Sequence, residues 1–311
     1  MVPLRLFPVK PRCVQTTEKR GLLCYRNLMQ TPLSGLRFSL AGPGKAGSSL
    51  ARWAMAAGAE LVAVAGRRVG EPAWPGGPPR VALEDLETAG QDLLLIAVGD
   101  GAVAEVAARL AARPQARVVL HTSGSLDASA LAPLRAAGSA PGSSIGSLHP
   151  LKALPRPLPD PAEGRGVFFA VDGDPEAREL AFRLAGAWGG VAAEVPAAAR
   201  PLYHFAATLA AGGVVTLLAA AAEIAGGIGL PEQVTRGYLE LARGALAAAT
   251  RALDEGQPLA AAITGPVTRD DRETLRKHLA ALGSLTTGKL PLAIFLLGEI
   301  LHQTGRDEPE E

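Results

Sequence analysis

The stretch LRFSLAGPGKAGSSLARWAMAAGAELVAVAG at residues 36–66 decides the fold of this chain. Residues 36–41 predict a strand, residues 45–57 predict a helix closed by Gly58, and residues 60–65 predict a second strand. A strand, a helix and a strand in this order form a βαβ unit with parallel strands.

The same alternation continues beyond this unit. Residues 92–98 form an almost continuous apolar run, which is typical of a strand buried on both faces. Further strands are predicted at 117–121, 144–148, 167–171 and 191–195, with helices at 102–112 and 175–188. We therefore expect an α/β domain with a Rossmann-type, doubly wound parallel sheet over residues 35–199.

The remainder of the chain shows no strand pattern. Long Ala- and Leu-rich helices are predicted at 201–228, 231–255, 268–283 and 289–304. We expect an all-helical domain over residues 200–305. Residues 1–34 are expected to form a flexible basic extension, and residues 306–311 an acidic tail.

The composition excludes several classes of protein. The formal net charge is +1, and no basic-aromatic stretch indicates nucleic-acid binding. Cys13 and Cys24 form no metal motif, so we expect no metal and a reducing, cytoplasmic location. Residues 205–222 carry no charge, but their Ala and Gly content favours a close-packed helix over a membrane span.

The turn between the first strand and the first helix has the spacing GxGxxG. Its glycines are Gly42, Gly44 and Gly47, and Pro43, Lys45 and Ala46 fill the other positions. Such a turn brings the pyrophosphate of a dinucleotide onto a helix N-terminus. The alternative is a glycine turn that binds nothing. A kinase-like phosphate loop fits poorly, because Lys45 precedes the last glycine.

The residues after the second strand indicate which dinucleotide is preferred. An NAD site usually has Asp or Glu there, whereas this chain has Arg67 and Arg68. Two guanidinium groups suit a 2′-phosphate, so the sequence predicts NADP(H), with NAD(H) as the second choice. A pair of solvated surface arginines is the alternative.

The carboxyl ends of two later strands should complete the cofactor site. Ligands of open α/β sheets bind at that edge. We expect contacts from Val98, Gly99, Asp100, Thr122 and Ser123. Asp100 is explained equally well as the cap of the following helix.

Five strings occur in one order along the chain. They are the glycine turn, His-Thr-Ser-Gly-Ser at 121–125, Gly-Ser-Leu-His-Pro at 146–150, Leu-Tyr-His at 202–204 and the segment 259–271. Together they resemble a family of Rossmann-like proteins with a helical C-terminal domain of unknown function, domain 2520. That family is similar to 6-phosphogluconate dehydrogenase, β-hydroxyacid dehydrogenases and pyrroline-5-carboxylate reductase.

The resemblance covers about residues 36–285. It implies a helical substrate and dimerisation domain, a homodimer, and NAD(P)-dependent oxidoreductase activity. The chain departs from the family at Gly212, where the family usually has Asn, and at Asp270, where it has Gly. It also has no clear counterpart of the lysine that the better-known dehydrogenases use.

Hydride transfer to a carbonyl or imine requires a proton donor. We predict His204 for this role, since it begins the long helix after the α/β domain, with Tyr203 beside it. His149 and Ser123 are further candidates at strand ends. A structural role explains each of these residues as an alternative.

Other residues are candidates for holding the substrate. His149 follows a strand, and Thr208 shares a helix face with His204. Thr264, Arg269 and Asp271 mark a loop entering a helix, where a carboxylate or phosphate could bind. A capped helix start with a surface ion pair explains the last three as well.

The sequence therefore predicts an NADP(H)-dependent oxidoreductase for a small anionic metabolite. The alternative is a sensor or scaffold that binds NADP(H) without turnover.

Overall fold

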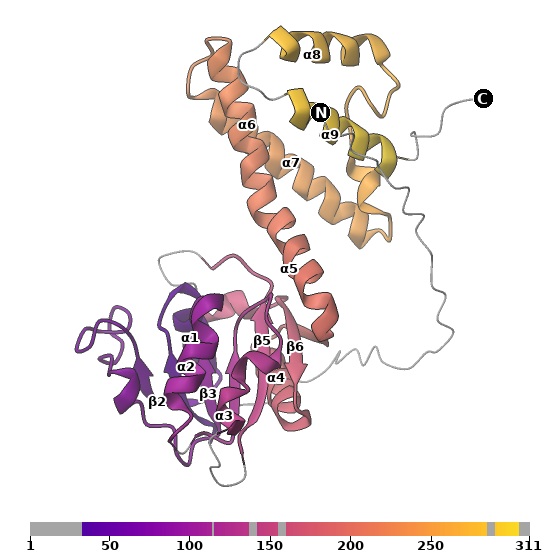
Figure 1. Cartoon of the computed structure of the whole chain (residues 1–311). Helices are drawn as coiled ribbons and strands as arrows, with labels where there is room; N and C mark the ends of the chain where they lie inside the picture. Colours follow the sequence, from indigo (N-terminus) through magenta and orange to yellow (C-terminus); the bar gives the residue numbers. More distant parts are fainter. Residues whose placement is uncertain (1–32, 114, 137–141, 155–159, 285–289, 305–311) are drawn as a thin grey trace, which may run out of the picture. The chain divides into compact units, whose positions relative to one another are not determined.

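The computed structural model describes residues 33–304 apart from 114, 137–141, 155–159 and 285–289. The expected basic extension and acidic tail lie almost entirely outside these residues. The described chain divides into two compact units, one ending at Tyr203 and the other beginning at His204 (Figure 1).

The first unit is built on a seven-stranded sheet with the order β2-β1-β3-β4-β5-β6-β7. The strands are β1 (Arg37–Ala41), β2 (Glu60–Ala65), β3 (Leu93–Ile96), β4 (Val118–His121), β5 (Ser144–Pro150), β6 (Phe168–Gly173) and β7 (Val191–Glu194). The strand β1 lies between β2 and β3, so the chain moves to one side of β1 to form β2 and then returns past β1 to form β3 on its other side. Ligand-binding crevices of open α/β sheets form at such a switch point, outside the carboxyl ends of the strands.

One pair of strands departs from the predicted parallel sheet. β6 runs antiparallel to β5, and the other neighbouring pairs are parallel. A parallel neighbour needs a long crossover, usually a helix. The described part of the 151–167 connection holds only a short 3-10 turn, Pro161–Gly164, so the chain returns in the opposite direction.

Helices cover both faces of the sheet. On one face lie α1 (Lys45–Ala56) and α4 (Pro175–Ala187), whose apolar side chains join Trp53, Phe169 and Trp188 in one core. On the other lie α2 (Asp100–Leu110) and α3 (Pro133–Ala136), which close a second core with residues such as Ile96 and Val119. The sheet is therefore doubly wound, as the sequence predicts.

The second unit is helical. It contains most of α5 (Arg200–Thr208), followed by α6 (Val214–Gly227), α7 (Val234–Asp254), α8 (Arg272–Ser284) and α9 (Leu290–Gln303). A single π turn, Leu209–Gly213, joins α5 to α6. These helices agree with the predicted all-helical segment. One helix of the described residues, 197–227, is long and apolar enough by length and composition to cross a membrane.

Candidate functional site

The glycine turn lies at the switch point, between the carboxyl end of β1 and the start of α1. Gly42 has φ of +95°, and a Cβ there would lie 2.6 Å from the Ala97 carbonyl oxygen. A Cβ on Gly47 would lie 2.2 Å from the Gly42 carbonyl oxygen. Both positions therefore require glycine for the packing of the turn itself.

Gly44 is different. Its φ is −76°, which any residue adopts, and a Cβ there would meet nothing within 4 Å. Gly44 is also the N-cap of α1, where no side chain caps the helix and no acidic residue lies in the first turn. The turn thus presents open space in front of uncapped backbone N–H groups, which is the arrangement that binds phosphate.

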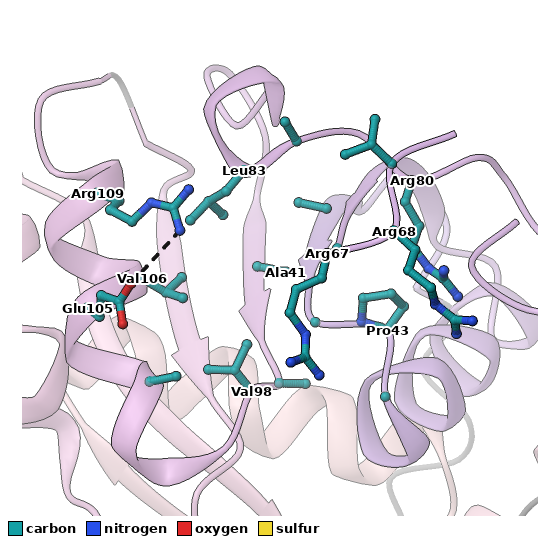
Figure 2. A pocket seen from close by; sticks show the side chains of 18 of the residues that line it. Ala41, Pro43, Arg67, Arg68, Arg80, Leu83, Val98, Glu105, Val106 and Arg109 are labelled. Atoms are coloured by element: carbon teal, nitrogen blue, oxygen red, sulfur yellow. Dashed lines mark ion pairs between the residues drawn. The ribbon is translucent and has the colours of Figure 1, made fainter. Parts of the chain in front are cut away.

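A cavity of about 1010 Å³ opens directly over this turn (Figure 2). Its walls come from the segments that follow β1, β2 and β3 and from the first turns of α2. Leu83, Val98 and Val106 give one part of the lining an apolar character. Three adjacent strand ends therefore form one crevice, and its size suits a nucleotide.

The end of β2 brings arginines to this cavity. Arg67 and Arg68 both line it and both are exposed. Figure 2 shows the Arg67 guanidinium directed toward the loop that carries Val98. Arg68 is paired with Glu71 at 3.3 Å between Nη1 and Oε2. The structure therefore brings the glycine turn and both predicted arginines together.

A third arginine of the cavity lies outside the predicted set. The Arg80 side chain is 9% exposed, donates from Nη2 to the Ala73 carbonyl at 3.2 Å and lies 3.4 Å from Glu71. Its Cδ would be 2.8 Å from a Cβ on Gly66, so the two residues pack closely. Arg80 follows a Pro- and Gly-rich loop, in which no periodicity marks a buried residue.

The cavity also contains two carboxylates, on the side of α2. Glu84 and Glu105 both pair with Arg109. The hydrogen bond from Arg109 holds the pKa of the Glu84 carboxyl below its usual range. Arg109 offsets one of these two negative charges, while Arg67 and Arg68 bring two positive charges to the end of β2.

Asp100 does not cap α2. The helix begins at Asp100 itself, and Gly99 is its N-cap. The Asp100 carboxylate instead accepts a hydrogen bond from the Ser125 hydroxyl at 2.5 Å. The capping interpretation was therefore wrong, and the carboxylate links the loops that follow β3 and β4.

Ser123 lies in the loop after β4, beside the buried Thr122. Its hydroxyl oxygen accepts hydrogen bonds from the backbone N–H groups of Ser125 at 3.3 Å and Leu126 at 3.1 Å. The hydroxyl thus shapes the loop, which supports the structural alternative for Ser123. The cofactor contacts expected of Thr122 and Ser123 stay predictions.

His121 is fully buried at the end of β4 and has two backbone partners. Its Nδ1 accepts from the Ser123 N–H at 3.2 Å, so the proton belongs on Nε2, which lies 2.9 Å from the Asp127 carbonyl oxygen. Burial lowers the pKa of His121, and the nearby Arg200 lowers it further. His121 is therefore a neutral structural histidine.

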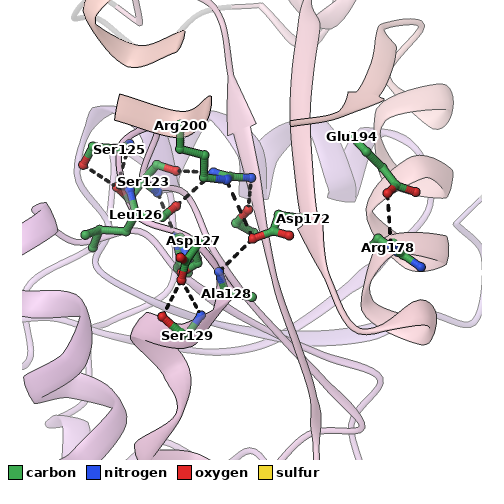
Figure 3. A network of polar contacts seen from close by, with 12 residues as sticks. Ser123, Ser125, Leu126, Asp127, Ala128, Ser129, Asp172, Arg178, Glu194 and Arg200 are labelled. Atoms are coloured by element: carbon green, nitrogen blue, oxygen red, sulfur yellow. Dashed lines mark hydrogen bonds and ion pairs between the residues drawn. The ribbon is translucent and has the colours of Figure 1, made fainter. Parts of the chain in front are cut away.

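Arg200 is fully buried beside the loop that follows β4 (Figure 3). Its Nη1 donates to the carbonyl oxygens of Leu126 at 3.0 Å and Ser123 at 3.4 Å, and its Nη2 donates to the Ser147 hydroxyl. Its Nε lies 3.8 Å from an Asp172 carboxylate oxygen. Sequence reasoning missed this network, because a lone Arg before Pro201 resembles an exposed helix start.

His149 and Tyr203 meet at the carboxyl end of β5. The Nδ1 atom of His149 lies 2.9 Å from the Tyr203 hydroxyl oxygen, and the ring centroids are 5.6 Å apart in an edge-on arrangement. Burial raises the pKa of the Tyr203 phenol, while Arg200 opposes this shift. Two of the predicted catalytic residues are therefore hydrogen-bonded to each other.

The remaining predicted residues belong to the second unit. The Thr208 hydroxyl donates to the His204 carbonyl at 3.0 Å, within the helix. The π turn that contains Gly212 interrupts the regular 3.6-residue spacing assumed between His204 and Gly212. The catalytic role predicted for His204 and the substrate role predicted for Thr208 are untested.

The loop before α8 has the features of a capped helix start. Asp271 accepts hydrogen bonds from the Thr274 N–H at 3.1 Å and from its hydroxyl at 2.7 Å, and these bonds lower the pKa of Asp271. This supports the capping alternative for Asp271. Substrate roles for Thr264 and Arg269 stay predictions. Within the described ranges, no group of three His, Cys, Asp or Glu residues could hold a metal ion.

Solved structures share this fold over most of the chain. Protein TM1727 from Thermotoga maritima is 18% identical with a TM-score of 0.65, covering 86% of this chain and 98% of its own. A Plasmodium falciparum pyrroline carboxylate reductase with NADP bound is 13% identical with a TM-score of 0.54, covering 88% and 99%. An NADH-preferring ketol-acid reductoisomerase from an uncultured archean is 15% identical with a TM-score of 0.53, covering 88% and 87%.

Sequence families also divide the chain into two parts, but the second match begins at residue 167, within the sheet unit, which ends at Tyr203. Comparison with curated protein sequences gives no match. Residues 34–150 match the Rossmann-like domain, and residues 167–291 match a domain of unknown function, DUF2520. The chain is therefore a Rossmann-like protein with a C-terminal DUF2520 domain.

Proposed function

We propose that this protein binds NADP(H) in the cavity over the glycine turn and acts as a cytoplasmic oxidoreductase on a small anionic metabolite. The observation that carries the proposal is Gly44. Neither its backbone conformation nor its protein neighbours require glycine, yet a side chain there would fill the space before the N-terminus of α1. A pyrophosphate in that space explains the missing side chain.

The preference for NADP(H) rests on the end of β2. Arg67 and Arg68 line the cavity where an NAD site would present a carboxylate. A guanidinium pair can bind a 2′-phosphate through charge-assisted hydrogen bonds. The apolar wall formed by Leu83, Val98 and Val106 offers a surface for the adenine ring.

Calorimetric titration with NADPH, NADH and 2′-phospho-ADP-ribose tests the binding proposal. We expect NADPH to bind more tightly than NADH by about tenfold or more. The double variant Arg67→Ala/Arg68→Ala should lose this preference, whereas Arg178→Ala, on α4 in an ion pair with Glu194, should keep it. Tighter binding of NADH contradicts the preference, and no binding of either dinucleotide contradicts the proposal as a whole.

Turnover is tested separately, by following NADPH oxidation against a panel of 2-keto acids and cyclic imines. Reduction of any member supports the oxidoreductase. Tight NADPH binding without turnover across the whole panel would instead indicate the non-catalytic sensor or scaffold.

We also propose that a second copy of the chain completes the helical unit. Phe205, Val215 and Leu241 expose 58%, 66% and 72% of their surface. A bilayer is a poor partner for this surface, because α7 packs on α6 and carries exposed charges such as Glu240 and Arg243. The apolar side chains of a second copy would cover these three side chains.

A further inference from the structure

The first turn of α5 is fixed to the sheet by a buried cation. Arg200 has no exposed surface and reaches the strands through Ser147 on β5 and Asp172 on β6. Asp172 also accepts a hydrogen bond from the Ala128 N–H at 3.0 Å. The guanidinium group thus ties the start of the helix to two strands and to the loop after β4.

Tyr203 lies one turn after this anchor. Residues three apart share a helix face, so Arg200 and Tyr203 point to the same side of α5. The Tyr203 hydroxyl reaches His149 at 2.9 Å, and its ring also lies 6.5 Å from the ring of Phe168. An anchored helix turn and two strands therefore hold the phenol in place.

The Tyr203–His149 pair lies at the same edge of the sheet as the cavity. β5 runs parallel to β4, and β4 runs parallel to β3, so His149 is at the carboxyl edge that also carries the glycine turn. Ligands of open α/β sheets bind at this edge. The nicotinamide end of a dinucleotide whose pyrophosphate lies on α1 would extend along it.

We propose that Tyr203 is the proton donor of the reaction, that His149 is the partner that resupplies its proton, and that Arg200 positions Tyr203. This inference rests on the proposed NADP(H)-dependent function. It replaces His204, which the sequence favours, with a residue whose hydroxyl the structure places in a hydrogen-bonded pair at the carboxyl edge.

When bound over the glycine turn, the reduced cofactor would supply a hydride to the carbon of a C=O or C=N bond, and the π electrons of that bond would move to the oxygen or nitrogen. That atom takes the proton of the Tyr203 hydroxyl, while the phenol oxygen takes a proton from Nδ1 of a protonated His149. The oxidised cofactor, the reduced product and a neutral His149 remain, and a hydronium ion from the solvent returns one proton to the imidazole, so each turnover consumes one proton.

Charge supports this assignment in both directions. Burial raises the pKa of Tyr203, so the phenol keeps its proton at neutral pH until the substrate needs it. As the proton leaves, the oxygen gains negative charge, and the nearby Arg200 guanidinium favours that charged form. Among the described residues, His149 is hydrogen-bonded to the phenol and Arg200 is the charged group that acts on its pKa.

The test uses nuclear magnetic resonance of tyrosine ring carbons, because the chain has only three tyrosines. Tyr203→Phe identifies the Tyr203 signal, and its titration gives the pKa of the phenol. NADP⁺ carries a positive nicotinamide ring, so bound NADP⁺ should lower this pKa by about one unit. Bound 2′-phospho-ADP-ribose, which has the same phosphates and no nicotinamide, should not.

The outcomes separate this inference from the proposed function. If neither ligand binds, the proposed function fails, and the inference fails with it. If both bind and the Tyr203 pKa responds identically, the nicotinamide is not beside Tyr203, and only the inference is overturned. A larger loss of kcat in His204→Ala than in Tyr203→Phe would return the role to His204.

Two further comparisons test the separate roles. On any compound that the wild type reduces, Tyr203→Phe should lower kcat about 100-fold or more with NADPH affinity unchanged, and His204→Ala should lower kcat less than Tyr203→Phe does.

Arg200→Met should raise the pKa of Tyr203, Arg200→Lys should restore it, and Arg178→Met should leave it unchanged. A folded Arg200→Met protein with an unchanged Tyr203 pKa would remove Arg200 from the proposal. If Arg200→Met does not fold, Arg200→Lys decides: the charge should keep the pKa close to the wild-type value, and a rise would contradict the role of the cation.

Discussion

The two units of this protein differ in how they use apolar side chains. In the sheet unit, large residues such as Trp53, Phe38 and Phe169 are almost completely buried. Among the described residues of the helical unit, the buried hydrophobic side chains are small, namely Ala220, Ala225, Ala252 and Val267. The comparison shows that the sheet unit encloses its own core, whereas the helical unit leaves large apolar side chains exposed in the single chain.

A matched pair of phenylalanines measures this difference most directly. Phe169→Ala should lower the free energy of unfolding by about 3–5 kcal/mol, because the side chain is fully buried. Phe205→Ala, at 58% exposure, should cost less than about 1 kcal/mol in dilute protein. Urea denaturation checks both values. Equal losses would mean that the exposed helix face already has a partner within the chain.

The second prediction concerns the proposed dimer of two copies of the chain. Val215→Glu combined with Leu241→Glu should weaken dimerisation about 100-fold or more, since each buried aliphatic side chain contributes about 1.5–3 kcal/mol. Analytical ultracentrifugation over a concentration series measures the change. Val191→Glu, at an exposed position of β7 in the sheet unit, is the control and should leave the dimer intact. A wild-type monomer at every concentration would contradict the homodimer.

The third prediction compares two glycines of one turn. Gly42→Ala should cost about 2 kcal/mol or more, because its positive φ alone is unfavourable by about 1–2 kcal/mol and the Cβ also meets Ala97. Gly44→Ala should leave the stability within about 0.5 kcal/mol and weaken NADPH binding. Thermal unfolding and calorimetry distinguish the two effects. Unchanged NADPH affinity in Gly44→Ala would contradict the phosphate site.

The smallest expected effect is a pH dependence in the sheet unit. Burial lowers the pKa of His121, so the unfolded chain takes up a proton at higher pH than the folded protein does. Stability is therefore complete above the usual histidine value and is lost as the pH falls below it. Between pH 7 and 5, the free energy of unfolding of the wild type should fall more steeply with falling pH than that of His121→Gln. The difference in slope should be up to about 1.4 kcal/mol per pH unit. Parallel curves would contradict a neutral, buried His121.

Local sequence patterns predicted the fold well, because each βαβ element carries its own periodicity and turn residues. The antiparallel β6 was missed, since strand direction depends on the connection rather than on the strand. The glycine turn and the arginines at 67 and 68 could be predicted because they are neighbours in sequence. Arg200, Ser147 and Asp172 could not, since they meet only through the packing of distant elements.

The buried Arg200 also determines when and where the sheet unit becomes complete. During synthesis, the strands through β7 leave the ribosome before Arg200 does. The polar groups that contact Arg200 therefore have no cation until this residue is also available. A chain cut after Ala199, at the boundary that the sequence suggests, would leave Asp172 and the carbonyl groups of the 123–126 loop without their cation. A chain cut after Tyr203 keeps Arg200 paired with these groups. The smallest complete sheet unit therefore includes the first turn of the helix that follows the sheet.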